Sequence, residues 1–313
     1  MTHTSGHGRL DAPDASTPDG HGIRGRRTPA DGEPGTARQP GTARQPADSP
    51  ATYDPETFWE ARLRGRFDLS GAGFRGIGKP FNEALYRQRE IVFDRVLRRL
   101  RIDPPQSRVV ELGPGTGFYV ELWKRRGVRS LLGLDITAVA SERLTAAYPS
   151  FAFQQVDITE PWPSPDASAD VVTAFDVLFH IVDDVRFATA IGEAGRVLRP
   201  GGVLLVSDLF PRRAIRGHHH VSRTLAEYKA ALARHGLDVV SRAPVFVTMH
   251  PAVDVPAALA ALSGRWWSWL ERWLIADPRR GRRMGRILAS IDRVLTRPLR
   301  GGPSTEVLIA RKR

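Results

Sequence analysis

The stretch VVELGPGTGFYVEL (residues 109–122) carries the side chains and spacing with the clearest chemical potential. An apolar run meets an acid, Glu111, and then turns at alternate glycines. These glycines are Gly113, Gly115 and Gly117. The dinucleotide pattern G-x-G-x-x-G is not met, because Phe118 stands where its third glycine belongs, and no Gly-Lys-Ser/Thr follows for a nucleoside triphosphate. Since Glu111 would repel a phosphate and suits an ammonium group, the turn favours a bulky ligand that is uncharged or zwitterionic.

Histidines form the second group of side chains that could do chemistry, because imidazole exchanges protons near neutral pH. His180 follows an apolar run and could act as a general base, or it could cap the helix start at Asp183-Asp184. Three more histidines are consecutive: His218, His219 and His220. They could bind a metal ion, but adjacent residues point in different directions. They follow the fifth predicted strand, and loops beyond the carboxyl ends of strands line the ligand site in such sheets, so we expect one of them to face a substrate. His250 is a further candidate of this kind.

The composition excludes several other chemistries. The chain of 313 residues has no cysteine, which removes disulfides, cysteine-ligated zinc, iron–sulfur clusters and a thiol nucleophile. The first residues lack the apolar segment of a signal peptide and no run of about 18 apolar residues occurs, so we expect a cytoplasmic protein. The net charge is +12, and nearly all of the positive side chains are arginines. This excess indicates one of two things: a surface that binds phosphate, nucleic acid or anionic lipid, or a coding bias toward Arg, Ala, Gly and Pro.

The elements that must position these residues alternate between strands and helices. Seven apolar runs predict strands at 109–112, 130–136, 151–157, 169–177, 201–208, 237–249 and 304–313. Amphipathic segments lie between most of them. This alternation predicts an α/β fold with a doubly wound, mostly parallel, seven-stranded Rossmann-like sheet.

Outside this sheet, the sequence predicts a disordered tail, an N-terminal helical cap and a helical insertion. Residues 1–50, with a repeated GTARQP hexapeptide, hold almost no large apolar side chains, so we expect a disordered tail. Residues 51–106 predict an N-terminal helical cap on a core of residues 107–249. Residues 250–303 predict a helical insertion before the final core strand, residues 304–313.

The insertion contains the tryptophan-rich stretch GRWWSWLERWL (264–274). Seven apolar residues are expected on one face of its first helix: Leu259, Leu262, Trp266, Trp269, Leu270, Trp273 and Leu274. Three interpretations stay open for this face. It could pack on the core, it could form a lid whose tryptophans enclose an apolar substrate, or it could lie on anionic lipid together with the arginine-dense segment 279–300.

The motifs resemble, in order and spacing, those of the class I S-adenosylmethionine-dependent methyltransferases of small-molecule type, over roughly residues 80–249 and the final strand. ELGPGTGF matches the first motif, LLGLDI ends in Asp135 and QQVDI supplies Asp157. AFDVLFHIVDD resembles the fourth motif and RVLRPGGVLLVSD the fifth-strand motif. The resemblance implies S-adenosylmethionine as cofactor, with Asp135 on the ribose hydroxyls and Asp157 on the adenine amino group. The cofactor-binding residues it implies are Glu111, Gly113, Gly115, Gly117, Asp135, Ile136, Asp157, Ile158 and Phe175.

The resemblance also implies a methyltransferase activity (EC 2.1.1). We expect O-methylation of a small-molecule acceptor in specialised metabolism, by in-line transfer with a possible histidine base. The candidate catalytic residues are His180 and His219, and the candidate substrate-binding residues are His218, His220 and Trp266. No metal site is expected, because Phe179 stands where ubiquinone-pathway relatives have an acid.

The sequence also bears on nucleic acids and membranes as partners. No Asn/Asp-Pro-Pro-Tyr sequence follows the fourth strand, so we expect no DNA partner. Two alternatives to a small-molecule enzyme stay open. One is a methyltransferase of RNA or another polyanion that uses the basic C-terminal region, and the other is a binding module in peripheral contact with a membrane. The sequence carries no signal for the oligomeric state.

Overall fold

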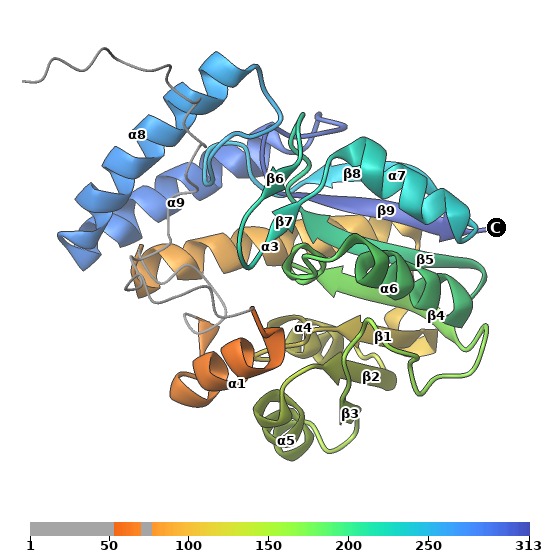
Figure 1. Ribbon diagram of the computed structural model, residues 1–313. Coiled ribbons are helices and arrows are strands. Elements are labelled where there is room, and N and C mark those ends of the chain that lie inside the picture. The colour runs from red at the N-terminus through yellow and green to blue at the C-terminus, as the bar shows by residue number, and fades with distance from the viewer. Residues whose placement is uncertain (1–52, 70–76) are drawn as a thin grey trace, which may run out of the picture. The chain divides into compact units, whose positions relative to one another are not determined.

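The computed structural model describes residues 53–69 and 77–313, and the predicted tail lies outside these residues. Its centre is a seven-stranded sheet in the order β3-β2-β1-β4-β5-β9-β8 (Figure 1). The strands are β1 Arg108–Leu112, β2 Ser130–Asp135, β3 Ala152–Gln155, β4 Ala169–Phe175, β5 Leu198–Asp208, β8 Leu237–Pro244 and β9 Glu306–Lys312. The neighbours from β3 to β5 pair in parallel, whereas β9 is antiparallel to both β5 and β8. The predicted mostly parallel, doubly wound sheet is confirmed.

Helices cover both faces of this sheet, and this explains why its strands read as continuous apolar runs. In β1, Val109 belongs to the apolar cluster of the α3 and α4 side, and Val110 to the cluster of the α6 and α7 side. The helices of the core are α3 Lys79–Leu100, α4 Phe118–Arg125, α5 Ala138–Ala147, α6 Asp184–Val197 and α7 Leu225–Arg234. The carboxyl ends of the parallel strands and the amino ends of the following helices therefore meet at one edge, where ligands bind in such sheets.

A short helix near the start of the described chain, α1 (Pro55–Gly65), lies against this edge. It begins at Asp54, whose carboxylate accepts a hydrogen bond from the backbone N–H of Thr57. Glu60 accepts a hydrogen bond from the backbone N–H of Val139 at 3.2 Å, at the start of α5. Leu63 is buried against Val139 and Ala140. Helix α1 is thereby attached next to the end of β2.

Two long helices, α8 (Ala257–Ile275) and α9 (Pro278–Leu295), form a hairpin between β8 and β9 (Figure 1). Helix α9 packs closely on α3, because Gly281 and Gly285 leave room for Phe81 and Ala84. The buried residues of α8 are Trp267, Leu270 and Leu274. Trp266 and Trp269, which the sequence places on the same face as Leu270, are exposed instead. The apolar residues of α8 occupy more of its circumference than one contact covers, so periodicity alone did not identify the buried side.

Two local features differ from the strand pattern that the sequence predicts. The strand expected over 237–249 ends at Pro244. The N–H groups of Val245 and Phe246 both bind the carbonyl of Thr305, and those of the next three residues bind a side chain rather than a neighbouring strand. The Asp292 carboxylate accepts hydrogen bonds from the N–H groups of Val247, Thr248 and Met249 at 3.0, 2.8 and 3.2 Å. An additional hairpin, β6 (Ile215–Arg216) and β7 (Val221–Ser222), holds the three consecutive histidines in its turn.

Candidate active site

The glycine turn between β1 and α4 has a backbone that other residues adopt only with strain. Gly115 has a φ of 53° and Gly117 a φ of 84°, both in the left-handed region. A Cβ atom at Gly117 would lie 2.6 Å from Cδ2 of Leu144, so this glycine is needed for packing. At Gly115 a Cβ atom would meet only the carbonyl oxygen of Gly113, at 3.9 Å. The turn thus leaves free space beside Gly115, which a ligand can approach closely.

Asp135, at the end of β2, is connected directly to this turn. Its carboxylate accepts hydrogen bonds from the backbone N–H of Gly115 at 2.9 Å and from the backbone N–H and hydroxyl of Thr137 at 2.9 and 2.7 Å. Burial raises the pKa of Asp135, and these hydrogen bonds oppose that rise. A carboxylate offers about four lone-pair positions, so at least one position is left for a further donor. The structure therefore brings together the Gly115 and Asp135 that the sequence proposes separately.

Two of the next three predicted cofactor residues, Asp157 and Ile158, lie in the loop after β3, and the third, Ile136, directly follows β2. Asp157 accepts hydrogen bonds from the backbone N–H and hydroxyl of Thr159, and it forms a salt bridge with Arg186 of α6. Ile158 is buried, and its carbonyl accepts a hydrogen bond from the indole N–H of Trp162 at 2.9 Å. The carbonyl of Ile136 accepts one from the side chain of Gln155 at 3.2 Å. Arg186 was not predicted as a site residue. It lies 29 residues from Asp157 in the sequence, so no local sequence pattern indicates that the two side chains pair.

Glu111 lies inside the core rather than on the surface of the turn. Its side chain is 2% exposed, and its carboxylate accepts hydrogen bonds from the indole N–H of Trp123 at 3.2 Å and from the hydroxyl of Thr173. Burial raises the pKa of Glu111 to about 8. At neutral pH this carboxyl group is therefore mostly protonated.

The end of β4 is fixed by contacts from α3 and α4. Phe175, a predicted cofactor residue, is buried and stacks on Tyr119 with ring centroids 4.0 Å apart. Asp176 follows with a φ of 57°, an uncommon backbone for a residue with a side chain. Arg89 of α3 forms a salt bridge with it at 2.5 Å, and the Ser207 hydroxyl donates to its carboxylate at 2.8 Å. The strained end of β4 is thus held by its neighbours, in an arrangement that the sequence did not reveal.

His180 and the histidine triplet lie together beyond the carboxyl end of β4. His180 ends a short 3-10 helix, η2 (Leu178–His180), and its Nδ1 lies 3.2 Å from the carbonyl oxygen of His219. Because a carbonyl oxygen only accepts hydrogen bonds, Nδ1 carries the proton and Nε2 carries the lone pair. Burial lowers the pKa of His180 to about 3, so its imidazole is neutral at physiological pH. Burial also lowers the pKa values of His219 and His220.

Aromatic side chains of α1 and the segment before it pack against these histidines. Trp59 lies edge-on to His180 with ring centroids 4.7 Å apart, and Phe58 stacks on His219 at 5.9 Å. Tyr53 contacts His218 at 6.1 Å. These contacts join residues more than 100 positions apart, so the sequence indicated the helix but not what it covers. Helix α1 and the histidines form one aromatic cluster at the ligand-binding edge.

Trp266, the third predicted substrate-binding residue, is not part of this cluster. Within residues 53–69 and 77–313, the ring that it contacts is that of Trp267, at 5.6 Å. It lies on α8 with 43% of its surface exposed. The structure thus brings together four of the predicted catalytic and substrate residues and leaves Trp266 apart from them. The four are His180, His218, His219 and His220.

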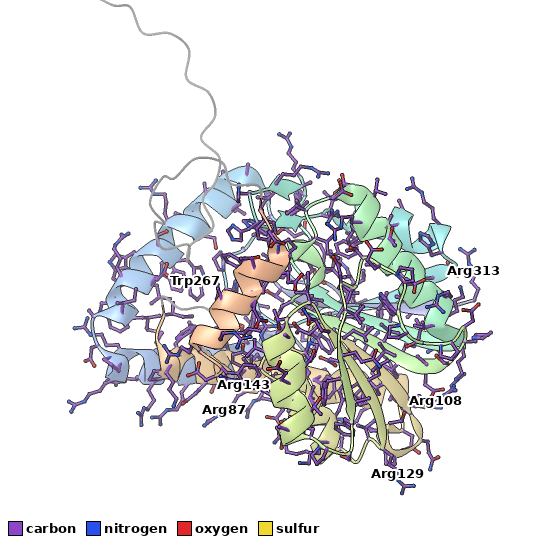
Figure 2. All side chains as sticks on the ribbon, turned by 60° about the horizontal axis from the view of Figure 1, so that its bottom comes forward. Arg87, Arg108, Arg129, Arg143, Trp267 and Arg313 are labelled. Atoms are coloured by element: carbon purple, nitrogen blue, oxygen red, sulfur yellow. The ribbon has the colours of Figure 1, made fainter. Side chains whose placement is uncertain are left out.

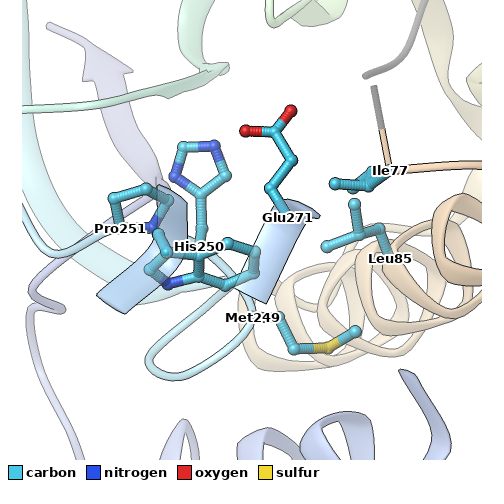
Figure 3. Close-up of a pocket in the computed structure, with 7 residues that line it drawn as sticks. Ile77, Leu85, Met249, His250, Pro251 and Glu271 are labelled. Atoms are coloured by element: carbon cyan, nitrogen blue, oxygen red, sulfur yellow. The ribbon is translucent and has the colours of Figure 1, made fainter. Parts of the chain in front are cut away.

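A small apolar pocket lies between α3, α8 and the segment after β8 (Figure 3). It is lined by Ile77, Leu85, Met249, His250, Pro251, Trp267 and Glu271. His250 and Glu271 project to the same side of it (Figure 3), and burial lowers the pKa of His250 to about 3. The Nδ1 atom of His250 is 3.1 Å from the Ser304 hydroxyl. His250 is thus held in place by core contacts and lines this small pocket.

Positive charge is spread over many elements. The arginines labelled in Figure 2 belong to α3 (Arg87), β1 (Arg108), the loop before β2 (Arg129), α5 (Arg143) and the C-terminus (Arg313). In residues 53–69 and 77–313, no three His, Asp or Glu side chains are grouped so that they could hold a metal ion. None of the helices in that part of the chain combines the length and apolar character needed to cross a bilayer.

Comparison with known proteins relates part of the chain to methyltransferases. Residues 110–206 match the family model described as a methyltransferase domain. A probable S-adenosylmethionine-dependent methyltransferase of Mycolicibacterium smegmatis is 36% identical over 122 residues, covering 39% of this chain and 44% of that protein. A malonyl-[acyl-carrier protein] O-methyltransferase of Serratia marcescens is 34% identical over 109 residues, covering 34% and 39%. The chain therefore spans less than half the length of these two curated relatives.

A solved structure shares the fold over a larger part of the chain. It is assigned as a sarcosine dimethylglycine methyltransferase from Galdieria sulphuraria, with a TM-score of 0.52 and 18% identity. The match covers 80% of this chain and 98% of that one. The sheet order, the glycine turn and the matched domain agree with one another. Residues 110–206 accordingly form a methyltransferase domain, and its relatives and fold place that domain with the class I S-adenosylmethionine-dependent methyltransferases, whose cofactor is S-adenosylmethionine.

Proposed function

We propose that this chain transfers the methyl group of S-adenosylmethionine to an oxygen atom of a small acceptor with an aromatic or apolar portion. When bound, S-adenosylmethionine supplies a methyl group on a positively charged sulfur, so the protein mainly has to align the two reactants. One observation carries the proposal. His180, whose Nδ1 donates to the His219 carbonyl, lies beside the aromatic rings of α1 at the sheet edge that also bears the glycine turn.

The residues around the turn fit the cofactor in their chemistry. The space beside Gly115 admits a ligand close to the backbone. Asp135 retains acceptor capacity for ribose hydroxyls, and its hydrogen bond to Gly115 keeps it next to that space. Asp157 is oriented by Thr159 and Arg186 and would accept from the adenine amino group, and Ile136 and Ile158 would supply apolar contacts to the cofactor.

His180 is proposed as the general base. Its Nε2 lone pair can take the proton of an acceptor hydroxyl, which leaves a more nucleophilic oxygen. The His219 carbonyl fixes the tautomer that makes this possible. The rings of Tyr53, Phe58 and Trp59 provide apolar surface on which a flat acceptor can stack, with His218 and His220 at its polar rim.

Oxygen as the accepting atom is supported by the name of one relative, the malonyl-[acyl-carrier protein] O-methyltransferase. The histidine base points the same way, since a hydroxyl needs to lose a proton whereas a neutral amine attacks without assistance.

The test measures transfer of tritiated methyl groups from S-adenosylmethionine to a panel of phenols, enols, carboxylic acids and amines. We expect a phenol or enol to be the best acceptor and His180→Gln to lower kcat by about 100-fold. The binding of S-adenosylhomocysteine should remain unchanged in this variant. His235→Gln is the matched control, because His235 lies at the end of α7, away from the cluster. Preferred transfer to amines, or equal losses in both variants, would contradict the proposal.

A further inference from the structure

The α8–α9 hairpin is anchored to the core by one side only. Trp267 packs edge-on against Phe81 of α3, with ring centroids 6.0 Å apart. Asp292 of α9 is fully buried and also accepts from the hydroxyl of Thr248 at 2.7 Å. Arg95 of α3 donates to the carbonyl of Thr296 at 2.9 Å. These contacts fix the inner side of the hairpin and leave its outer side without a partner among the described residues.

The outer side is apolar. In the described part of the chain, ten of the twelve exposed large apolar side chains lie between residues 259 and 299. On α8 they recur at helical spacing: Leu259, Leu262, Trp266 and Trp269. On α9 they do so again: Ile287, Ile291, Val294 and Leu295. We call these eight residues the outer surface of the hairpin. Leu262 and Trp269 are 62% and 54% exposed, and the helical spacing of each set places its members along one side of their helix.

Arginines border the outer surface. Segment 257–300 contains ten arginines: Arg265, Arg272, Arg279, Arg280, Arg282, Arg283, Arg286, Arg293, Arg297 and Arg300. Its three acids are occupied elsewhere, since Asp292 binds the core, Asp277 caps α9 and Glu271 lines the pocket. None of the salt bridges found in residues 53–69 and 77–313 includes these arginines. Their charge is therefore available to an external partner.

The two helices lie side by side in both overall views (Figures 1 and 2), so the apolar face and the arginines belong to one region. On α9 the spacing of Arg279, Arg282, Arg286 and Arg293 places them along one side of the helix, between the buried side and the apolar side. An apolar face bordered by arginines, with tryptophan among its members, has the composition of a helix that lies in the plane of a lipid headgroup layer. A nucleic acid would pair with the arginines but would leave the apolar residues in water.

We propose that the outer surface of the α8–α9 hairpin docks the protein on the surface of an anionic lipid bilayer. Tryptophan and leucine side chains would enter the boundary between headgroups and acyl chains, and the arginines would contact lipid phosphates. Docking in this orientation needs no change in the hairpin, because its inner contacts with α3 and the 247–249 segment are already made.

The experiment is sedimentation of the full chain with vesicles of phosphatidylcholine, with and without phosphatidylglycerol. We expect binding to the anionic vesicles, weakened by salt. The double variant Leu262→Ser/Trp269→Ser should lower the partition coefficient by about tenfold or more. The matched control is Val185→Ser/Val240→Ser, which removes two exposed apolar residues away from the hairpin and should bind as the wild type does. Equal binding of the two double variants would overturn the proposal.

A second variant pair tests the charge and covers the case in which the first pair misfolds. Arg282→Gln/Arg286→Gln should weaken binding to anionic vesicles, whereas Arg87→Gln/Arg129→Gln should not. Binding of S-adenosylhomocysteine and the unfolding temperature verify that each variant is folded. Three results would contradict the proposal: equal effects of both arginine pairs, binding to RNA but not to vesicles, or a dimer by light scattering that Leu262→Ser/Trp269→Ser dissociates. The last result would assign the outer surface to a second copy of the chain.

Discussion

Replacing Glu111 with glutamine tests how the acid of the glycine motif is used. Its carboxyl group is buried between Trp123 and Thr173, and burial raises its pKa to about 8 from an ordinary value of 4.5. Glutamine has the same shape and can still accept the hydrogen bond from Trp123. The Thr173 hydroxyl lies 3.4 Å from the carbonyl of Val110 and can donate there, so it is free to accept from the new amide.

The size of the effect follows from proton linkage. Between about pH 4.5 and about pH 8 the folded chain keeps the proton on Glu111 and the unfolded chain has lost it. Because the folded state binds more protons, the free energy of unfolding falls as the pH rises through this window, by about 1.4 kcal/mol per pH unit. By pH 7 the loss from this group is about 3 kcal/mol. Glu111→Gln should therefore be more stable than the wild type by up to about 3 kcal/mol at pH 7, and by little near pH 4.5.

The assay is urea unfolding followed by tryptophan fluorescence at several pH values between 5 and 8, with Glu142→Gln as an exposed control. The wild type and the control should lose stability more steeply than Glu111→Gln as the pH rises. Titration with S-adenosylhomocysteine on the same samples separates the two roles of this acid. Since the carboxyl group points into the core, we expect its affinity to change by less than about threefold, well under 1 kcal/mol. Parallel stability profiles would refute the linkage argument, and a large loss of affinity would show that the side chain acts on the cofactor.

Three further outcomes follow from other contacts. Because burial lowers the pKa of His180 to about 3, the kcat/KM of the wild type should show no acid limb near pH 6.5; a limb there that disappears in His180→Gln would show an ordinary imidazole. Asp292→Ala should lower the free energy of unfolding in urea by about 3 kcal/mol or more, since it leaves several buried N–H donors unpaired. A loss below about 1 kcal/mol would contradict the role of Asp292 in anchoring the hairpin. Gly115→Ala should cost only about 1 kcal/mol of stability yet weaken S-adenosylhomocysteine binding by about tenfold or more, because the new methyl group enters the free space beside the turn. Gly65→Ala in α1 is its control. Equal affinities of these two variants would show that the space beside Gly115 does not hold the cofactor.

The sheet could be predicted because its strands are buried on both faces and therefore read as continuous apolar runs. In β5, for example, Leu204 and Leu205 enter opposite clusters, so neither position tolerates a polar residue. The glycine turn and the acid at Asp135 were also readable, since a positive φ and the end of a strand leave local signatures. The family resemblance then combined these signatures into one predicted cofactor site.

The features that could not be predicted depend on partners far away in the sequence. The segment after β8 is held by Asp292, which lies more than 40 residues away from the N–H groups that it binds. The contact of Trp59 with His180 and the salt bridge of Arg89 with Asp176 arise only when the sheet brings distant loops to one edge. On α8 the reason is different, because its apolar residues surround most of the helix and two faces compete for burial.

The central claim, that the turn at Gly115 and the carboxylate of Asp135 form the site of S-adenosylmethionine, is tested most directly by one calorimetric titration. Wild type and Asp135→Asn are each titrated with S-adenosylhomocysteine after circular dichroism has shown that both are folded. We expect saturable binding at one site in the wild type and an affinity at least about tenfold lower in Asp135→Asn, since the amide cannot accept from two ribose hydroxyls in the same way. No binding to the folded wild type, or equal affinity in the variant, would contradict this account.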